Sequence, residues 1–253
     1  MFRHQGKSRT LQHNLRIAII LSFVAGVVNV SGYLAFKQLT TNVTGHFALF
    51  IDDVARFQFW KGTIYFLYIF SFLLGSFFSS FLIEKYNENK RLNVFAIPTI
   101  IESFILITIG ILSNFVNITY PNLVICTLLF AMGLQNSFVT KISNAVVRTT
   151  HLTGLFTDLG IDISHLFFAK YKPQSKTIQS NIKLRIYIIL FFFAGGLLGG
   201  FLYSRVHLEL NTLIFGAFIL LISLFYDDIR YKFIKGKRKY HQKNQYLNTK
   251  TTT

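Results

Sequence analysis

The feature that most constrains this chain is the uneven placement of its charged residues. No charged side chain occurs in 62–83, 186–204 or 210–226, and 92–140 contains a single one, Glu102. The polar turn 113–122 divides that long run, and 17–36 forms a further apolar segment. Each of these six segments approaches the ~20 residues that an α-helix needs to cross ~30 Å of hydrocarbon. The sequence therefore predicts an all-α, polytopic membrane protein with six transmembrane helices.

The few charges that the chain does carry predict its orientation. Charged residues make up only 14% of the 253 residues, yet the net charge is +16. The two ends and every second connection hold 22 of the 26 Lys and Arg residues, and the other connections hold four. Because basic connections stay on the cytoplasmic side, we expect both termini of this membrane protein in the cytoplasm. A cleaved signal peptide is the competing interpretation, but five further spans follow the first apolar run and no clear cleavage site does.

Three stretches of the first half of the chain occur again, in the same order, in the second half. Such ordered similarity indicates an internal duplication. Each copy contains three spans, an odd number, so the second copy enters the membrane from the opposite side. The sequence thus predicts two three-helix repeats of inverted topology, with amphipathic or re-entrant segments after helices 1 and 4. The matched stretches are Gly26–Asn29 with Gly133–Asn136, TTNVTGHFALFIDDVAR (40–56) with TTHLTGLFTDLGID (149–162), and LLGSFFSSFL (73–82) with FAGGLLGGFL (193–202).

These assignments divide the chain into five parts. Residues 170–185 are hydrophilic and basic, and we expect a loop there. The basic tail is expected to bind the anionic membrane surface rather than nucleic acid. The parts are 1–14, a basic cytoplasmic N-terminus; 15–112, the first repeat; 113–122, an extracellular turn; 123–226, the second repeat; and 227–253, a basic cytoplasmic tail.

Small residues spaced four apart predict where helices approach each other closely. Thr44-Gly45 and Thr153-Gly154 are expected to cap helix N-termini, whose exposed N–H groups favour anions. The predicted packing residues are Gly75, Ser79, Gly195, Gly196, Gly199 and Gly200.

Polar side chains inside apolar segments are candidates for function. Glu102 is expected near the middle of the bilayer, where an ionisable residue marks a functional site by default. A structural partner such as Asn29 or Gln135 is the alternative. Asp158, Asp162 and His165 fall on one helical face that could ligate a divalent cation, although such a face is more often simply solvated. We predict no metal site, no cofactor and, since no catalytic motif is present, no enzyme.

The motifs GVVNVSGYLAFKQLTTNVTGHF and MGLQNSFVTKISNAVVRTTHLTGLFTDLGID resemble the YoaK family of bacterial multi-pass membrane proteins. The resemblance extends from Asn14 to about Asp227. It implies a six-helix inner-membrane protein, often described as a permease. It implies no established substrate and no catalytic residues.

The leading hypothesis is a small secondary transporter for a small molecule or ion, embedded in the lipid bilayer, with a proton as coupling ion if Glu102 or Asp158 titrates. A non-transporting scaffold or partner-binding subunit is the first alternative, and a membrane-embedded enzyme is the second. A homo-oligomer is compatible with the sequence. The residues expected to line the pathway are Asn29, Asn42, Thr44, Gly45, His46, Glu102, Asn136, Thr150, His151, Thr153, Gly154 and Asp158.

Overall fold

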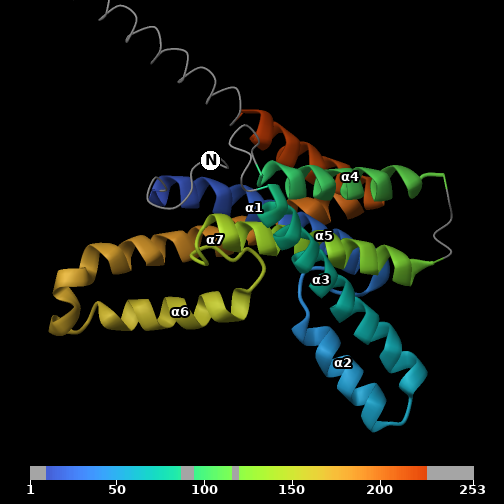
Figure 1. Cartoon of the computed structure of the whole chain (residues 1–253), viewed down its shortest axis with the longest axis horizontal. Coiled ribbons are helices and arrows are strands. Elements are labelled where there is room, and N and C mark those ends of the chain that lie inside the picture. Colours follow the sequence, from blue (N-terminus) through green and yellow to red (C-terminus); the bar gives the residue numbers. More distant parts are fainter. Residues whose placement is uncertain (1–9, 87–93, 116–119, 227–253) are drawn as a thin grey trace, which may run out of the picture.

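The fold is built from α-helices throughout the part of the chain that the structure describes. The computed structural model describes residues 10–86, 94–115 and 120–226. A last helix, 212–226, follows the elements labelled in Figure 1. The elements are α1 (Leu11–Phe36), α2 (Thr44–Ala55), α3 (Phe59–Tyr86), α4 (Ala96–Leu112), α5 (Pro121–Ile142), α6 (Leu152–His165), the 3-10 helix η2 (Ala169–Gln174), α7 (Ser175–Ser204) and the 3-10 helix η3 (Glu209–Asn211).

Five helical segments are long and apolar enough to cross a membrane: α1, α3, α5, Ala169–Ser204 and Glu209–Tyr226. The sixth expected span, α4, is apolar but has only 17 residues, about 26 Å at 1.5 Å per residue. That is slightly less than the ~30 Å hydrocarbon core. The all-helical, multi-pass prediction is therefore confirmed, while α4 is shorter than the predicted third helix, 92–112.

The helices of the bundle pack in two dominant pairs. α1 packs most extensively against α7, and α3 packs most extensively against α5, which also contacts α4 and α1. α1 supplies much of the core, with Ile17, Leu21, Val24 and Val28 fully buried. The most exposed spans are α3 and α7, whose outward faces are apolar and therefore suited to lipid.

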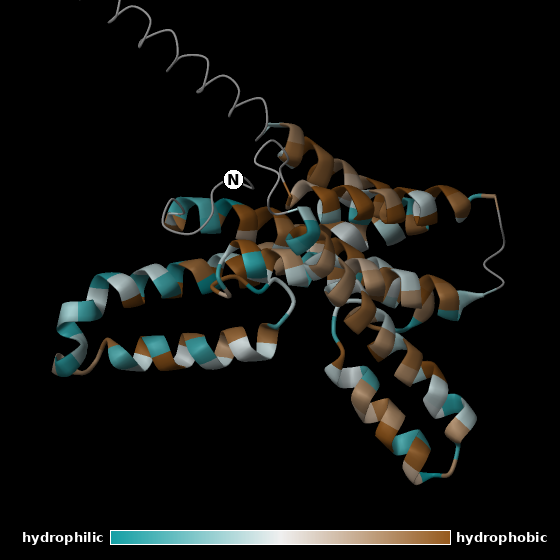
Figure 2. Ribbon diagram, viewed as in Figure 1, coloured by the Kyte–Doolittle hydropathy of each residue, from teal (hydrophilic) through white to brown (hydrophobic). Residues whose placement is uncertain are grey.

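Two hairpins extend from the central bundle in different directions (Figure 1). α2 lies along the first part of α3, and α6 lies along the first part of α7. α2 turns apolar side chains such as Phe47, Leu49 and Ile51 outward, where they are exposed. The α6–α7 hairpin mixes hydrophilic and hydrophobic residues, while α4 is mostly hydrophobic (Figure 2). The amphipathic segments expected after helices 1 and 4 correspond to α2 and α6.

The predicted loop at 170–185 is wrong, because α7 already begins at Ser175. The first turns of α7 bury Ile178 and Leu184, and Arg185 forms an ion pair with Asp162 of α6. A basic segment is therefore helical here because it has a partner helix that buries one of its faces. Such a partner is separated from it in sequence and leaves no local signal.

The predicted threonine caps are also wrong. The N-cap residues of α2 and α6 are Val43 and His151, and neither makes a side-chain capping hydrogen bond. Thr44 is the first helical residue of α2 and is exposed. The first turn of α2 is instead supported by Asn42, whose Oδ1 accepts a hydrogen bond from the Gly45 N–H at 3.3 Å.

Candidate functional site

The first repeated motif forms a corner in which the chain folds back onto α1. Thr41 Oγ1 donates a hydrogen bond to Asn29 Oδ1 at 2.8 Å, and Thr40 Oγ1 donates to the Val28 carbonyl at 3.1 Å. Both threonines are buried. Gly32 makes this return possible, since a Cβ there would lie 2.4 Å from Thr40 Cγ2. Asn29 therefore fixes the start of the α2–α3 hairpin relative to α1.

The second motif forms a corner with the same kind of contacts. Thr150 Oγ1 donates to Asn136 Oδ1 at 2.9 Å. Thr149, fully buried, accepts a hydrogen bond from Gln135 Nε2 at 3.0 Å. Asn136 thus fixes the start of the α6–α7 hairpin relative to α5, as Asn29 does for the other hairpin.

His46, expected to line a pathway, is buried beside the first corner. Its Nε2 lies 2.6 Å from the Leu39 carbonyl, so this nitrogen carries the proton, and the buried Nδ1 has no hydrogen-bond partner among the described residues. The ring stacks on Tyr65 and meets Tyr68 edge-on. Burial lowers the pKa of His46, and the hydrogen bond to Leu39 opposes that shift. His46 is therefore a neutral part of the wall between α2 and α3.

Four predicted residues of the second motif lie on or next to α6. The His151 ring covers Gly154, where a Cβ would come within 2.5 Å of the ring, so a larger residue at this position would displace the ring. Thr153 is exposed. Asp158 forms an ion pair with Arg185 of α7 at 3.5 Å, and the same guanidinium pairs with Asp162. One arginine therefore holds two carboxylates of α6 against α7.

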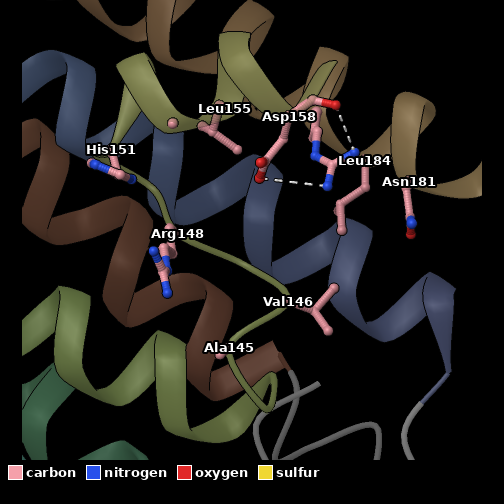
Figure 3. A pocket seen from close by; sticks show the side chains of 10 residues that line it. Ala145, Val146, Arg148, His151, Leu155, Asp158, Asn181 and Leu184 are labelled. Carbon is pink, nitrogen blue, oxygen red and sulfur yellow. Dashed lines mark hydrogen bonds and ion pairs between the residues drawn. The ribbon is translucent and has the colours of Figure 1, made fainter. Parts of the chain in front are cut away.

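A pocket of about 340 Å³ lies between the α5–α6 connection, α6 and α7 (Figure 3). We call it the α6–α7 pocket. Arg148 is exposed and, among the described residues, has no ion-pair partner. The pocket thus combines an unpaired guanidinium with carboxylate, imidazole and amide groups, a polar lining suited to a charged or strongly polar solute. Its walls are Ala145, Val146, Arg148, His151, Gly154, Leu155, Asp158, Asn181, Leu184 and Arg185.

A second pocket, of about 330 Å³, lies between α3, the end of α2 and the start of α5. We call it the α2–α3 pocket. Tyr68 donates a hydrogen bond to Asn122 Oδ1 at 2.6 Å. Asp53 Oδ2 is buried and has no hydrogen-bond donor within the described part of the chain. The residues lining this pocket are Gln38, Asp53, Lys61, Ile64, Tyr65, Tyr68 and Asn122.

Residues 17–226 match the profile of the family described as "Protein of unknown function (DUF1275)". This chain belongs to the DUF1275 family. Over 182 residues the DUF1275 chain is 26% identical to the UPF0700 transmembrane protein YoaK of Bacillus subtilis (strain 168), an alignment that covers 71% of this chain and 79% of that protein. No solved structure matches it. The resemblance to the YoaK family is confirmed, and with its apolar helices this DUF1275 chain is a multi-pass membrane protein.

The α6 face that could have ligated a cation is not free in this DUF1275 protein. Asp158 and Asp162 both pair with Arg185, and the His165 ring stacks on Tyr171 with centroids 4.0 Å apart. Among the described residues no group of three potential metal ligands comes together. The face therefore serves to hold α6 against α7.

Glu102 lies in neither pocket. It is fully buried in α4, and neither of its carboxylate oxygens has a hydrogen-bond partner among the described residues. The two amides considered as structural partners bond elsewhere: Asn29 accepts from Thr41, and Gln135 donates to Thr149 and to the Leu21 carbonyl. The alternative that Glu102 is satisfied by one of these amides is therefore wrong.

Sequence reasoning missed several basic, aromatic and amide residues that line the two pockets. Several of these residues lie just before the small-residue stretches 73–82 and 193–202. From the sequence alone they resemble the ordinary polar end of a helix. The missed residues are Lys61, Tyr65, Tyr68, Asn122, Arg148, Asn181 and Arg185.

Proposed function

We propose that this DUF1275 protein is a secondary transporter for a small molecule or ion in the bacterial cytoplasmic membrane. It works by alternating access between two three-helix repeats of inverted topology, 15–112 and 123–226. The observation that carries the proposal is that the two pockets use corresponding positions of the two copies. Extended without a gap, the match of 73–82 with 193–202 pairs Lys61 with Asn181, Ile64 with Leu184 and Tyr65 with Arg185. All six of these residues line the pockets.

The two corners support the same proposal. Asn29 holds Thr41 and Asn136 holds Thr150, and the two hydrogen bonds differ by only 0.1 Å in length. In each case an asparagine in the first helix of a copy anchors the segment that leads into the hairpin. Each hairpin therefore pivots at an equivalent point, as expected when one copy moves against the other.

The close helix contacts give further support, because the second spanning helix of each copy, α3 or α7, packs on the first helix of the other copy. A Cβ on Gly195 would lie 2.0 Å from the Phe23 carbonyl, and a Cβ on Gly75 would lie 2.1 Å from the Phe130 carbonyl. The reverse contacts correspond as well: Gly26 approaches the Phe192 carbonyl, and Gly133 approaches the Phe72 carbonyl. Because a helix of each copy packs on a helix of the other copy, the two copies are coupled. A hairpin therefore cannot move without affecting the other copy.

In the proposed mechanism the α6–α7 pocket opens to the cytoplasm and the α2–α3 pocket to the outside. Both termini are cytoplasmic, as the distribution of basic residues indicates. Solute enters one pocket and passes between the two corners. The solute leaves by the other pocket after the two hairpins have moved relative to the bundle. The charged groups at the two mouths, Arg148 and Lys61, make first contact with the solute.

The proposal is tested by reconstituting the purified full chain into liposomes and measuring uptake of a broad panel of labelled polar metabolites. Arg148→Gln and Lys61→Gln should each lower uptake by about tenfold or more, since a hydrogen bond to a charged group is worth about 1.5–3 kcal/mol. Lys176→Gln is the matched control, because Lys176 is exposed on α7 and lines neither pocket. Uptake of no solute by folded protein, or equal uptake by all three variants, would contradict the proposal.

A further inference from the structure

The α4 face that carries Glu102 is turned toward the protein interior. Thr99, Ser103 and Leu106 share this face and are buried, whereas Ile100 and Phe104 are exposed. Glu102 is the seventh residue of α4, about 9 Å along the axis from the start of the helix and about 15 Å from its end. The carboxyl group is therefore held inside the bundle, away from both lipid and the two aqueous faces.

The polar groups nearest to Glu102 on its own helix are already used. Thr99 Oγ1 donates to the Phe95 carbonyl at 3.1 Å, and Ser103 Oγ donates to the Thr99 carbonyl at 2.8 Å. Both hydroxyls therefore give their single hydrogen to a backbone carbonyl, of the N-cap residue Phe95 or of α4 itself. Among the described residues, no other side chain or backbone group donates to either oxygen of Glu102.

No charged group from the elements packed on α4 neutralises Glu102. On α5 the only charged residue is Lys141, which pairs with Glu84 of α3 at 2.6 Å. Glu209 of η3 is followed by Leu210, whose carbonyl approaches Gly110, eight residues or about 12 Å along α4 from Glu102. The last helix has no charged residue within 212–226. The other titratable residues of α3, α5 and the last helix are Lys61, Tyr65, Tyr68, Lys85, Tyr86, Cys126 and Tyr226, and no described one pairs with Glu102.

Among the described residues, an ionised carboxylate in such a place would be buried without a donor or a counter-charge, at a large cost in free energy. Glu102 is therefore held as the neutral acid in this conformation. We propose that Glu102 is a proton-binding site whose carboxylate takes up one proton from water when the bundle opens to one face and releases it when the bundle opens to the other. As the coupling site it rests on the proposed transport function, but the proton binding itself can be measured without a solute.

Dicyclohexylcarbodiimide provides the direct test, because this apolar reagent reacts with protonated carboxyl groups in membranes. The full chain is treated in liposomes over a pH series, and the adduct is located by mass spectrometry of peptides. We expect a stable adduct on Glu102 at neutral pH that decreases as the medium becomes alkaline. Glu84 and Glu209, which are exposed, should remain unlabelled at neutral pH. Absence of an adduct on Glu102, or labelling no greater than that of Glu84 and Glu209, would overturn the proposal.

A conservative variant separates proton binding from folding and from transport. Glu102→Gln keeps the shape of the neutral acid and should be produced and melt like the wild type, without an adduct. Glu102→Asp should regain part of the labelling. For any solute that the liposomes take up, a pH-sensitive dye inside them should report acidification with wild-type protein and none with Glu102→Gln. Equal acidification by both would remove Glu102 from the coupling while leaving transport intact. Labelling of Glu102 without uptake of any solute would leave the proton site intact and remove the transport function.

Discussion

Gly195 offers the sharpest test of the helix packing, because its contact with α1 leaves no room for a methyl group. In Gly195→Ala the new Cβ would lie 2.0 Å from the Phe23 carbonyl oxygen, where ordinary contact begins at 3.4 Å. The obstacle is backbone, which cannot rotate aside. α7 must therefore move away from α1 by about 1.4 Å, the difference between those distances, or the backbone must bend locally.

The expected cost follows from this geometry. A gap of about 0.5–1 Å already removes a quarter to a half of the dispersion energy of each contact, and inserting a methyl group into a packed core costs about 1–3 kcal/mol. Alanine also has a better helix propensity than glycine by about 1 kcal/mol, which would hide part of the effect. A control that gains the same propensity without a clash is therefore needed.

Two glycines of the same chain provide such controls. Nothing lies within 4 Å of a Cβ built on Gly160 of α6, and a Cβ on Gly200 of α7 would only touch Val30 Cγ1 at 3.4 Å. Relative to Gly160→Ala, Gly195→Ala should lower the free energy of unfolding by about 1–3 kcal/mol. This corresponds to about 2–12 °C in melting temperature for a chain of this size. Gly75→Ala, with its Cβ 2.1 Å from the Phe130 carbonyl, should behave like Gly195→Ala.

The assay is thermal unfolding in detergent micelles, followed with a maleimide dye that fluoresces on reaction with Cys126. This cysteine is the only one in the chain and is partly buried in α5. Melting of Gly195→Ala at the same temperature as Gly160→Ala would refute the close approach of α7 to α1. A lower melting temperature in Gly195→Ala but not in Gly75→Ala would refute the equivalence of the α1–α7 and α3–α5 pairs.

Three further predictions concern the corner, the buried histidine and the topology. Asn29→Ala and Thr41→Val should each destabilise the protein by about 0.5–1.5 kcal/mol. The double variant should lose less stability than the sum of the two single variants, because the two side chains share one hydrogen bond. Additive losses of stability would count against that hydrogen bond. Burial lowers the pKa of His46 below 6.5, so the folded state binds fewer protons than the unfolded one. Stability should therefore fall as pH drops through about 6.5. His46→Phe should weaken this pH dependence of stability, and an unchanged pH dependence would assign it to another group. In a Cys126→Ser background, cysteines placed at Ser113 and Lys172 should react with an impermeant maleimide from the outside and the inside of the cell respectively, and the reverse pattern would overturn the orientation.

Much of the fold could be predicted from local sequence. Pro121 begins α5 at its first position, where a missing N–H costs nothing, and the uncharged runs correspond to apolar helices. The beginning of α7 could not be predicted, because its first turns are polar and become helical against α6. The caps were missed for a related reason: several residues near each helix start can support it, and only the bond from Gly45 to Asn42 shows which one does.

The candidate site was predictable to a lesser degree. The repeated motifs located both corners, but only the structure shows that Asn29 holds Thr41 and that Asn136 holds Thr150 there. Arg185 was not expected at all, although it holds two carboxylates of α6 that lie more than 20 residues away in the chain. A residue's type indicates which interactions it can make. Its partner depends on which distant segment the tertiary fold brings next to it.

The sequence by itself determined that this chain is a helical membrane protein, because the length and polarity of a segment decide whether it is stable in hydrocarbon. It also identified the small residues that permit close packing and the one acidic residue inside the apolar runs. Only the tertiary structure decided that α7 packs on α1 and α3 on α5, that two pockets lie beside the hairpins, and that Glu102 has no partner among the described residues. These are relations between segments distant in sequence, and they depend on the shape of both surfaces rather than on the composition of either one.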